Sequence, residues 1–177
     1  MQFPLLHTER LSLIEIKQDH LNDLFQIFSN PEVTRFYNLL PFKEPKDAQK
    51  FIDWYQSRFT EGLAIRWGIA LKGEQSIIGT IGFNNYTKHH RANIGYDLQK
   101  EYWNNGYITE ALKAIISYGF KELEINRIEA EVMSGNESSE KALHKMNFTK
   151  EGVLREWMFW NSKYYDMIMY SLLKRET

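Results

Sequence analysis

The chain has 177 residues, of which 43% are hydrophobic, 25% charged and 15% aromatic. This length predicts a single domain over residues 1–177 with a substantial core, and the aromatic content excludes a disordered chain. No cysteine is present, which excludes disulfides and thiolate chemistry, and the net charge of -1 shows no basic excess of the kind that nucleic-acid binding requires.

The first third of the chain reads as a strand followed by two helices. Alternating apolar positions predict a strand over residues 10–16. After Asp19, apolar residues follow helical spacing until Asn30-Pro31, where the helix is expected to end. A second helix is expected between Pro45 and Gly62, with its apolar residues on one face.

From residue 63 the apolar period changes to two, which predicts an antiparallel meander. Its three strands are expected over residues 63–71, 76–86 and 91–98. A long helix is expected to begin near Gly106, a strand to cover residues 127–133, and a short helix to cover residues 136–146, with Asn147 as a left-handed cap. Two closing strands are expected over residues 153–160 and 164–173. This order predicts an α+β fold in which one mixed sheet of about seven strands carries helices on both faces.

The most informative segment is DLQKEYWNNGYITEAL, residues 97–112, in which a strand leads through a polar loop directly into a helix. Such a loop can turn several backbone N–H groups outward at a helix N-terminus, where they bind phosphate best. Gly106 permits close backbone approach and Thr109 adds a hydroxyl. On these residues alone, a plain strand–helix connection remains the other interpretation.

A second strand–loop–helix segment covers residues 126–152. Asn136 and Ser139 stand where its helix begins, and both types are favoured helix N-caps. Capping alone is sufficient to explain them, so these residues by themselves do not require a functional role.

Together the two segments resemble the GNAT superfamily of N-acetyltransferases, of the Rim type that acetylates the N-termini of ribosomal proteins. The resemblance covers nearly the whole chain and rests on the order and spacing of its motifs. These are TERLSL (8–13), NPEVTRF (30–36), WGIAL (67–71), IIGTIGF (77–83), NIGYDL (93–98), YWNNGYITEAL (102–112), NRIEAEV (126–132), NESSEKALHKMNFTKEGVLRE (136–156) and YYDMIMYSLL (164–173).

The resemblance implies acetyl-coenzyme A (acetyl-CoA) as the co-substrate. The family places its pyrophosphate on the loop that corresponds to Trp103, Asn104, Asn105, Gly106, Tyr107, Ile108 and Thr109. It places the pantetheine arm between two splayed parallel strands, against the backbone near Tyr96 and Leu98, with Asn136 and Ser139 beside the arm. The superfamily loop pattern, [R/Q]-x-x-G-x-[G/A], falls on Trp103, Gly106 and Ile108, so this chain departs from it at two of three positions.

The reaction implied by the resemblance is direct attack of an amine on the thioester in a ternary complex, which needs a neutral amine. An α-amine is about one-tenth neutral at pH 7, whereas a lysine-like amine is neutral in roughly one molecule per few thousand. By its place before Asn136, Glu131 corresponds to a glutamate base of one Rim branch, and an exposed strand carboxylate is the alternative interpretation. Glu156 is the second candidate, because another branch has a glutamate where this chain has Met158, and strand alternation predicts that Glu156 and Met158 share a face.

For the departing sulfur, the resemblance implies Ser139 as hydrogen-bond donor or acid. Other superfamily members use a tyrosine at the position of Leu143. A serine hydroxyl is a weak acid, but a thiol of pKa about 8.5 needs little help to leave. The oxyanion donor is expected to be a backbone N–H near Leu98.

The preferred acceptor is therefore a protein or peptide N-terminal α-amine. The alternatives are a small-molecule amine, such as a polyamine or antibiotic, and a non-catalytic CoA-binding sensor, for which Leu143 and Met158 are the motive. No nucleic-acid or membrane partner and no metal ligand set are expected. The N-terminal residues lack a signal-peptide pattern, which predicts a cytoplasmic location. Exposed aromatic residues in the last strands would suit a homodimer or higher homo-oligomer.

Overall fold

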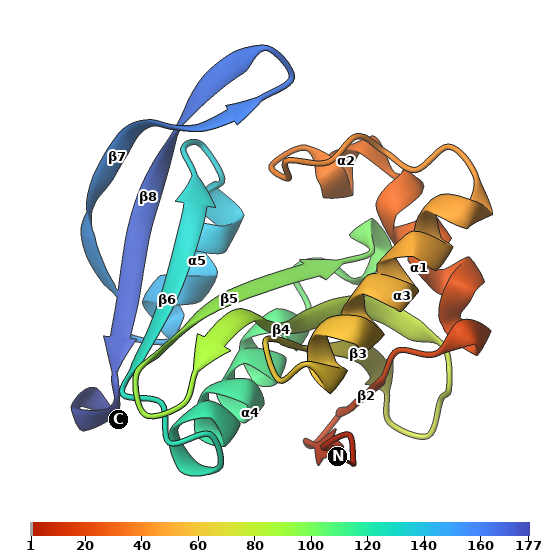
Figure 1. Cartoon of the computed structure of the whole chain (residues 1–177), viewed down its shortest axis with the longest axis horizontal. Helices are drawn as coiled ribbons and strands as arrows, with labels where there is room; N and C mark the ends of the chain where they lie inside the picture. Colours follow the sequence, from red (N-terminus) through yellow and green to blue (C-terminus); the bar gives the residue numbers. More distant parts are fainter. Residues whose placement is uncertain (1) are drawn as a thin grey trace.

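The computed structural model describes residues 2–177, and within that range eight strands form one sheet in the order β1–β2–β3–β4–β5–β6–β8–β7 (Figure 1). The strands are β1 (Leu6–His7), β2 (Leu11–Glu15), β3 (Ile65–Leu71), β4 (Ile77–Thr87), β5 (Arg91–Leu98), β6 (Arg127–Met133), β7 (Thr149–Trp160) and β8 (Lys163–Leu173). Every neighbouring pair is antiparallel except β5 and β6, which are parallel.

Helices cover both faces of this sheet (Figure 1). They are α1 (Leu21–Ser29), α2 (Pro31–Thr34), α3 (Pro45–Thr60), α4 (Tyr107–Lys121) and α5 (Glu137–Lys145), with 3₁₀ turns η1 (Gln18–His20), η2 (Lys100–Tyr102) and η3 (Lys174–Glu176). Within residues 2–177 no helix has the length and apolar character needed to cross a bilayer.

Two hydrophobic clusters hold these layers together. One joins the sheet to α4 and α5, through residues such as Leu112 and Leu143, and the other joins it to α1 and α3, through residues such as Phe28. Ile69 and Ala70, successive residues of β3, belong to different clusters. Because successive strand side chains point to opposite faces, the sheet is buried on both sides here.

The predicted α+β fold with one mixed sheet is confirmed, with three local differences, one of which is that β7 begins at Thr149 rather than at residue 153. The strand count is eight rather than about seven, because the short strand β1 carries no alternation that sequence could show. Asn30-Pro31 does end α1 as predicted, but it also begins α2. The Asn30 side chain accepts a hydrogen bond from the Glu32 backbone N–H at 2.9 Å, so Asn30 caps a new helix at the same point.

The parallel strands β5 and β6 separate soon after they meet. Residues 91–93 pair with residues 127–129. Beyond these pairs, β5 runs on to Leu98 and β6 to Met133 without pairing to each other. The sheet therefore opens at the end of β5, where the chain leaves for α4, as the splayed central strands of the sequence resemblance predict.

Candidate functional site

The loop from β5 to α4 is held in place by its own side chains. The Trp103 indole N–H donates to the Leu98 carbonyl at 2.7 Å, which ties the loop to the last residue of β5. The Asn105 side-chain amide donates to the carbonyls of Tyr102 and Trp103 at 3.2 and 3.0 Å. These bonds use carbonyl oxygens of the loop, and the backbone N–H groups of its last part, from Asn104 on, are not among the donors.

The backbone N–H groups from Asn104 to Thr109 donate no hydrogen bond to any other group of residues 2–177. Asn104 and Gly106 have φ angles of 62° and 79°, in the left-handed region that glycine adopts freely and asparagine tolerates. A Cβ built at Gly106 would have one heavy atom within 4 Å, the Arg10 Nη2 atom at 3.6 Å. The result is an open cradle of unpaired amides at the start of α4, which fits a phosphate or diphosphate group.

The opening between β5 and β6 is bridged on one face by two hydroxyl groups. Tyr96 of β5 and Ser139 of α5 lie 2.7 Å apart between Oη and Oγ. Burial raises the pKa of Tyr96 to about 12, so this phenol stays protonated at neutral pH. Asn136 caps α5 by accepting from the Ser139 backbone N–H at 3.3 Å, so the capping interpretation of its Oδ1 atom is correct. Leu143 is fully buried in the core.

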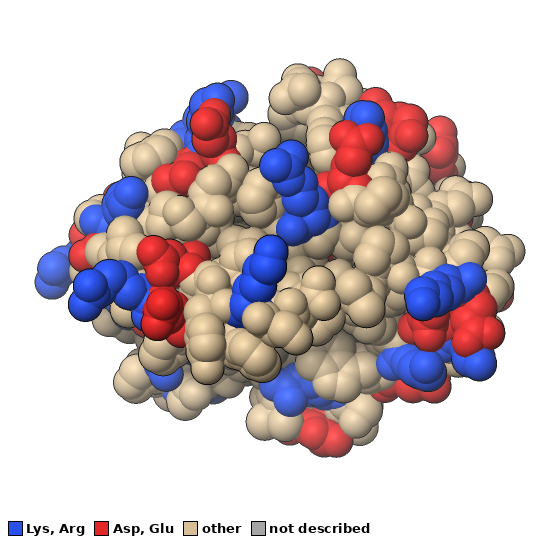
Figure 2. Space-filling model, turned by 90° about the horizontal axis from the view of Figure 1, so that it is seen from above, with Lys and Arg blue, Asp and Glu red and all other residues tan. Residues whose placement is uncertain are grey.

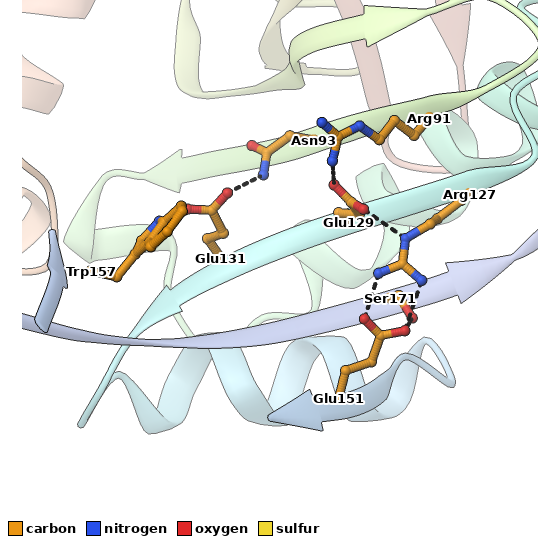
Figure 3. Close-up of polar contacts among 8 residues, drawn as sticks. All are labelled: Arg91, Asn93, Arg127, Glu129, Glu131, Glu151, Trp157 and Ser171. Carbon is orange, nitrogen blue, oxygen red and sulfur yellow. Dashed lines mark hydrogen bonds and ion pairs between the residues drawn. The ribbon is translucent and has the colours of Figure 1, made fainter. Parts of the chain in front are cut away.

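Glu131 lies on the opposite face of the same opening. Its neighbours Ala130 and Val132 are in the core with α4 and α5, so alternation turns Glu131 away from those helices. Its carboxylate accepts hydrogen bonds from the Asn93 side-chain amide at 3.4 Å and from the Trp157 indole N–H at 3.2 Å (Figure 3). Both donors are neutral, and the side chain is exposed. This carboxylate is therefore available to a basic ligand.

Glu129, two residues earlier on β6, has different surroundings. Arg91 and Arg127 bond its two carboxylate oxygens at 3.1 and 2.6 Å, and the residue is 8% exposed (Figure 3). Of the two glutamates, only Glu131 lacks a cationic partner among the contacts of residues 2–177. The ion-pair partners thus distinguish the two glutamates, which the sequence alone did not.

Glu156 lies where β7 is irregular. Leu154 pairs with Met167 and Met158 with Tyr165, so three residues of β7 stand opposite Asp166. The φ angle of Glu156 is 52°, and its backbone N–H donates to the Asp166 carboxylate at 2.8 Å. Simple alternation, which would place Glu156 and Met158 on one face, is therefore interrupted at this bulge.

Two residues to which sequence analysis gave no role contact the amide cradle. Arg10 and Glu110 belong to the TERLSL and YWNNGYITEAL motifs, but they are 100 positions apart in the chain. Only the close packing of β2 against the start of α4 brings them together. Trp157 and Asn93, the partners of Glu131, were likewise not paired with it by any sequence pattern.

Comparison with known proteins gives consistent results. The family model described as Acetyltransferase (GNAT) domain matches residues 10–149. A relative named "Uncharacterized N-acetyltransferase YoaA" from Bacillus subtilis is 42% identical over 173 residues, which are 97% of this chain and 98% of that protein. The [Ribosomal protein uS5]-alanine N-acetyltransferase of Escherichia coli is 29% identical over 114 residues, 63% of this chain and 59% of that one.

A solved structure shares the fold over nearly its whole length. The crystal structure of a GNAT-family acetyltransferase from Bacillus anthracis superposes with a TM-score of 0.88 and 24% sequence identity. The match covers 98% of this chain and 100% of that one.

Proposed function

This chain belongs to the GNAT acetyltransferase family and is an acetyl-CoA-dependent N-acetyltransferase, and we propose that its acceptor is the N-terminal α-amine of a protein or peptide. One observation carries the proposed place of the transfer reaction. The amide cradle leads into the opening between β5 and β6, which has the Ser139 hydroxyl on one face and the Glu131 carboxylate on the other. Donor and acceptor can therefore approach from opposite faces and meet between the strands.

In the proposed site, acetyl-CoA supplies an activated acetyl thioester. The backbone N–H groups of residues 104–109 hold its diphosphate, because they are unpaired and lie at the positive end of α4. The end of β5 from Tyr96 to Leu98, which pairs with β4 but not with β6, lines the pantetheine arm, with Ser139 and Asn136 across the opening. Ile108 departs from the superfamily loop pattern, but in the first turn of α4 it would offer the diphosphate only its backbone N–H group. Its larger side chain therefore needs no contact with the donor.

Glu131 is proposed to take the proton of the attacking amine, directly or through one water. Its carboxylate accepts only from neutral groups and faces the side of the opening away from α5. Ser139 is proposed to donate a hydrogen bond to the departing sulfur. The Tyr96 hydroxyl lies 2.7 Å from Ser139 Oγ, and either oxygen can donate in this contact; with the phenol as donor, the serine proton is free to point at the sulfur.

The choice of an α-amine rests on proton availability and on surface charge. A single carboxylate suffices for an amine of which about one-tenth is neutral at pH 7, and it is a weak device for a lysine-like amine. On the face shown in Figure 2, acidic and basic side chains are interspersed, and there is no extended acidic patch of the kind that would attract a polyamine. The uS5-alanine acetyltransferase relative has a protein acceptor in its name.

The test is an acceptor panel read by free-thiol release. N-terminal peptides, peptides whose α-amine is blocked but which carry lysine, polyamines and aminoglycosides are compared at equal concentration. We expect the free α-amine peptides to have the highest kcat/KM. Faster acetylation of a polyamine or of a blocked lysine peptide would overturn the acceptor assignment and leave the acetyltransferase activity intact.

The base is tested with Glu131→Gln. Because a positioned general base contributes roughly 10²–10⁴-fold, kcat should fall by about 100-fold or more while the Kd for CoA stays unchanged. The matched control is Glu156→Gln, a nearby exposed carboxylate whose loss should change kcat by less than about threefold. If Glu156→Gln gave the larger loss, the base would be assigned to β7 instead.

A further inference from the structure

Arg10, in the turn before β2, makes three contacts with the start of α4. Its Nη1 atom donates to the Asn105 carbonyl at 3.1 Å, and its Nε atom donates to the Glu110 carboxylate at 2.7 Å. Its guanidinium also stacks over the Tyr107 ring, 4.6 Å from the centroid. A residue far away in sequence is thus fastened to both sides of the amide cradle.

Glu110 fixes this arrangement from the helix. Its Oε1 atom accepts from the Thr8 hydroxyl at 2.6 Å and from the Arg10 backbone N–H at 2.8 Å, while Oε2 accepts from the Arg10 side chain. Burial opposes ionisation of Glu110, but the hydrogen bonds from Thr8 and Arg10 outweigh burial and hold its pKa below the usual value. The carboxylate is therefore charged at neutral pH and is 17% exposed.

The contact with the Asn105 carbonyl determines where the next amide points. The peptide bond between Asn105 and Gly106 is trans, and in a planar trans peptide the C=O and N–H groups point in opposite directions. Because Arg10 holds the carbonyl on its own side, the Gly106 N–H points away from Arg10. Gly106 has a φ of 79°. Because glycine adopts many backbone conformations, Gly106 would leave this one more easily if the Asn105 carbonyl were not held.

Charge gives Arg10 a second task. A glutamate in the first turn of a helix repels an anion bound at the N-terminus, since both compete for the same positive end of the dipole. The ion pair with Arg10 offsets the charge of Glu110 next to the cradle. No group of residues 2–177 accepts from Nη2 of Arg10, which lies beside Gly106.

From these contacts we propose that Arg10 is a positioning residue for donor binding: anchored by Glu110, it turns the Asn105 carbonyl aside so that the amides of residues 104–109 converge on the diphosphate of acetyl-CoA. The proposal rests on the proposed function for the cradle itself. It assigns to the N-terminal segment a role in holding the donor, although that segment lies outside the loop motif.

The test compares ligands with and without a diphosphate. Binding of CoA and of pantetheine is measured by calorimetry for the wild type, Arg10→Gln and the double variant Arg10→Gln/Glu110→Gln, and kcat/KM is measured with acetyl-CoA and with S-acetyl-pantetheine. Arg155→Gln, an exposed arginine on β7, is the matched control. Thermal unfolding of each variant shows whether the fold is retained.

We expect Arg10→Gln to weaken CoA binding by about tenfold or more and to lower kcat/KM for acetyl-CoA in proportion, with both values for the pantetheine ligands within about twofold of wild type. The double variant should remain weak, because the carbonyl is still released. Arg155→Gln should match the wild type.

Three results would overturn the proposal. Equal losses for CoA and pantetheine would mean that Arg10 only stabilises the fold. Recovery of CoA affinity in the double variant would mean that Arg10 only offsets the charge of Glu110. Unchanged CoA affinity in Arg10→Gln would mean that it does neither. If the wild type itself bound no CoA, the proposed donor site would fail instead, so the two failures are distinguishable.

Discussion

At the scale of single residues, charged neighbours distinguish two glutamates that the sequence alone does not distinguish. Glu129 and Glu131 are two positions apart on one strand, yet one is enclosed by two arginines and the other accepts only from an amide and an indole (Figure 3). Sequence could name Glu131 only through its distance from Asn136. The partners that distinguish the two glutamates come from β5 and β7, and their arrival depends on strand pairing that no local pattern encodes.

Arg127, which pairs with Glu129, also pairs with the more exposed Glu151, and this second pair predicts an effect of pH on stability. Hydrogen bonds from Arg127, and then from Ser171, hold the pKa of Glu151 at about 2, below the usual value near 4.5. Since the folded pKa is the lower one, the stabilisation is complete above about pH 4.5 and is lost as the pH falls toward 2. Glu151→Gln should therefore lower the Tm by a constant amount above pH 5, and this difference should shrink between pH 4.5 and 2.

Calorimetry or circular dichroism across this pH range provides the measurement. The control is the same substitution in an Arg127→Gln background, where only the Ser171 hydrogen bond to Glu151 remains and the difference should vary much less with pH. A difference between wild type and Glu151→Gln that persists undiminished at pH 2 would contradict the assignment of this pKa to the Arg127 pair.

At the scale of elements, close packing of two central strands predicts an intolerant glycine. A Cβ built at Gly82 of β4 would lie 2.0 Å from the Ile65 carbonyl oxygen and 2.8 Å from the Arg66 Cα atom. Both are backbone atoms of β3 and cannot move aside without opening the pair. Gly82→Ala should therefore destabilise the protein by at least about 3 kcal/mol in urea unfolding, at or beyond the upper end of ordinary overpacking.

Gly152 of β7 is the matched control, because nothing lies within 4 Å of its built Cβ and its φ is not positive. Gly152→Ala should change the free energy of unfolding by no more than about 0.5 kcal/mol. Equal effects of the two substitutions would show that strand propensity, rather than the β3–β4 approach, determines the outcome.

Most elements could be predicted from sequence, since period and caps are local signals. The α4 start at Tyr107 after Gly106, and the left-handed Asn147 with φ of 61° after α5, follow directly from residue types. The prediction that was wrong is the regular alternation of side-chain faces along β7. Its bulge near Glu156 depends on how Asp166 of β8 bonds to it, so alternation alone misjudged which residues share a face. Irregular pairing of this kind is a property of two strands together.

At the scale of the whole molecule, a buried polar network connects the segment that follows α2 to the sheet. Arg66 of β3 and Asp97 of β5 pair at 2.6 Å with side chains 6% and 1% exposed. Thr80 of β4 donates to Asp97 at 2.7 Å, and Tyr37, after α2, donates to it at 3.1 Å. One carboxylate thus links three strands to the segment that follows α2, which stands at the same end of the molecule as the β7–β8 hairpin (Figure 1).

Removing that carboxylate should leave Arg66 buried and unpaired. Asp97→Ala is expected to cost about 3–5 kcal/mol of unfolding free energy, as for other broken buried pairs. Replacing both partners by apolar residues, Arg66→Met with Asp97→Leu, should recover part of this loss because no isolated charge remains. Urea unfolding of the three proteins provides the measurement, and a double variant less stable than Asp97→Ala would contradict this account.

The overall fold class could be predicted because the order of elements restricts the possible topologies. The contact between Arg10 and Glu110, 100 positions apart, and the contact of Tyr37 with Asp97, 60 positions apart, could not, since packing alone brings these residues together. Sequence singled out the loop that is proposed to bind the donor, through Asn104 and Gly106. It could not show that Arg10, near the N-terminus, donates a hydrogen bond to that loop.

The short parallel contact between β5 and β6 divides the sheet into two parts. Strands β1 to β5 form one part and β6, β8 and β7 the other, and within the sheet they are joined only where residues 91–93 pair with residues 127–129. Beyond these paired residues, the main chains of β5 and β6 are not joined by hydrogen bonds between the strands. A bound donor whose amide groups hydrogen-bond to both strands would hold them together. Without the donor, local opening should be easiest between β5 and β6, and amide hydrogen exchange in both strands should slow when the ligand binds.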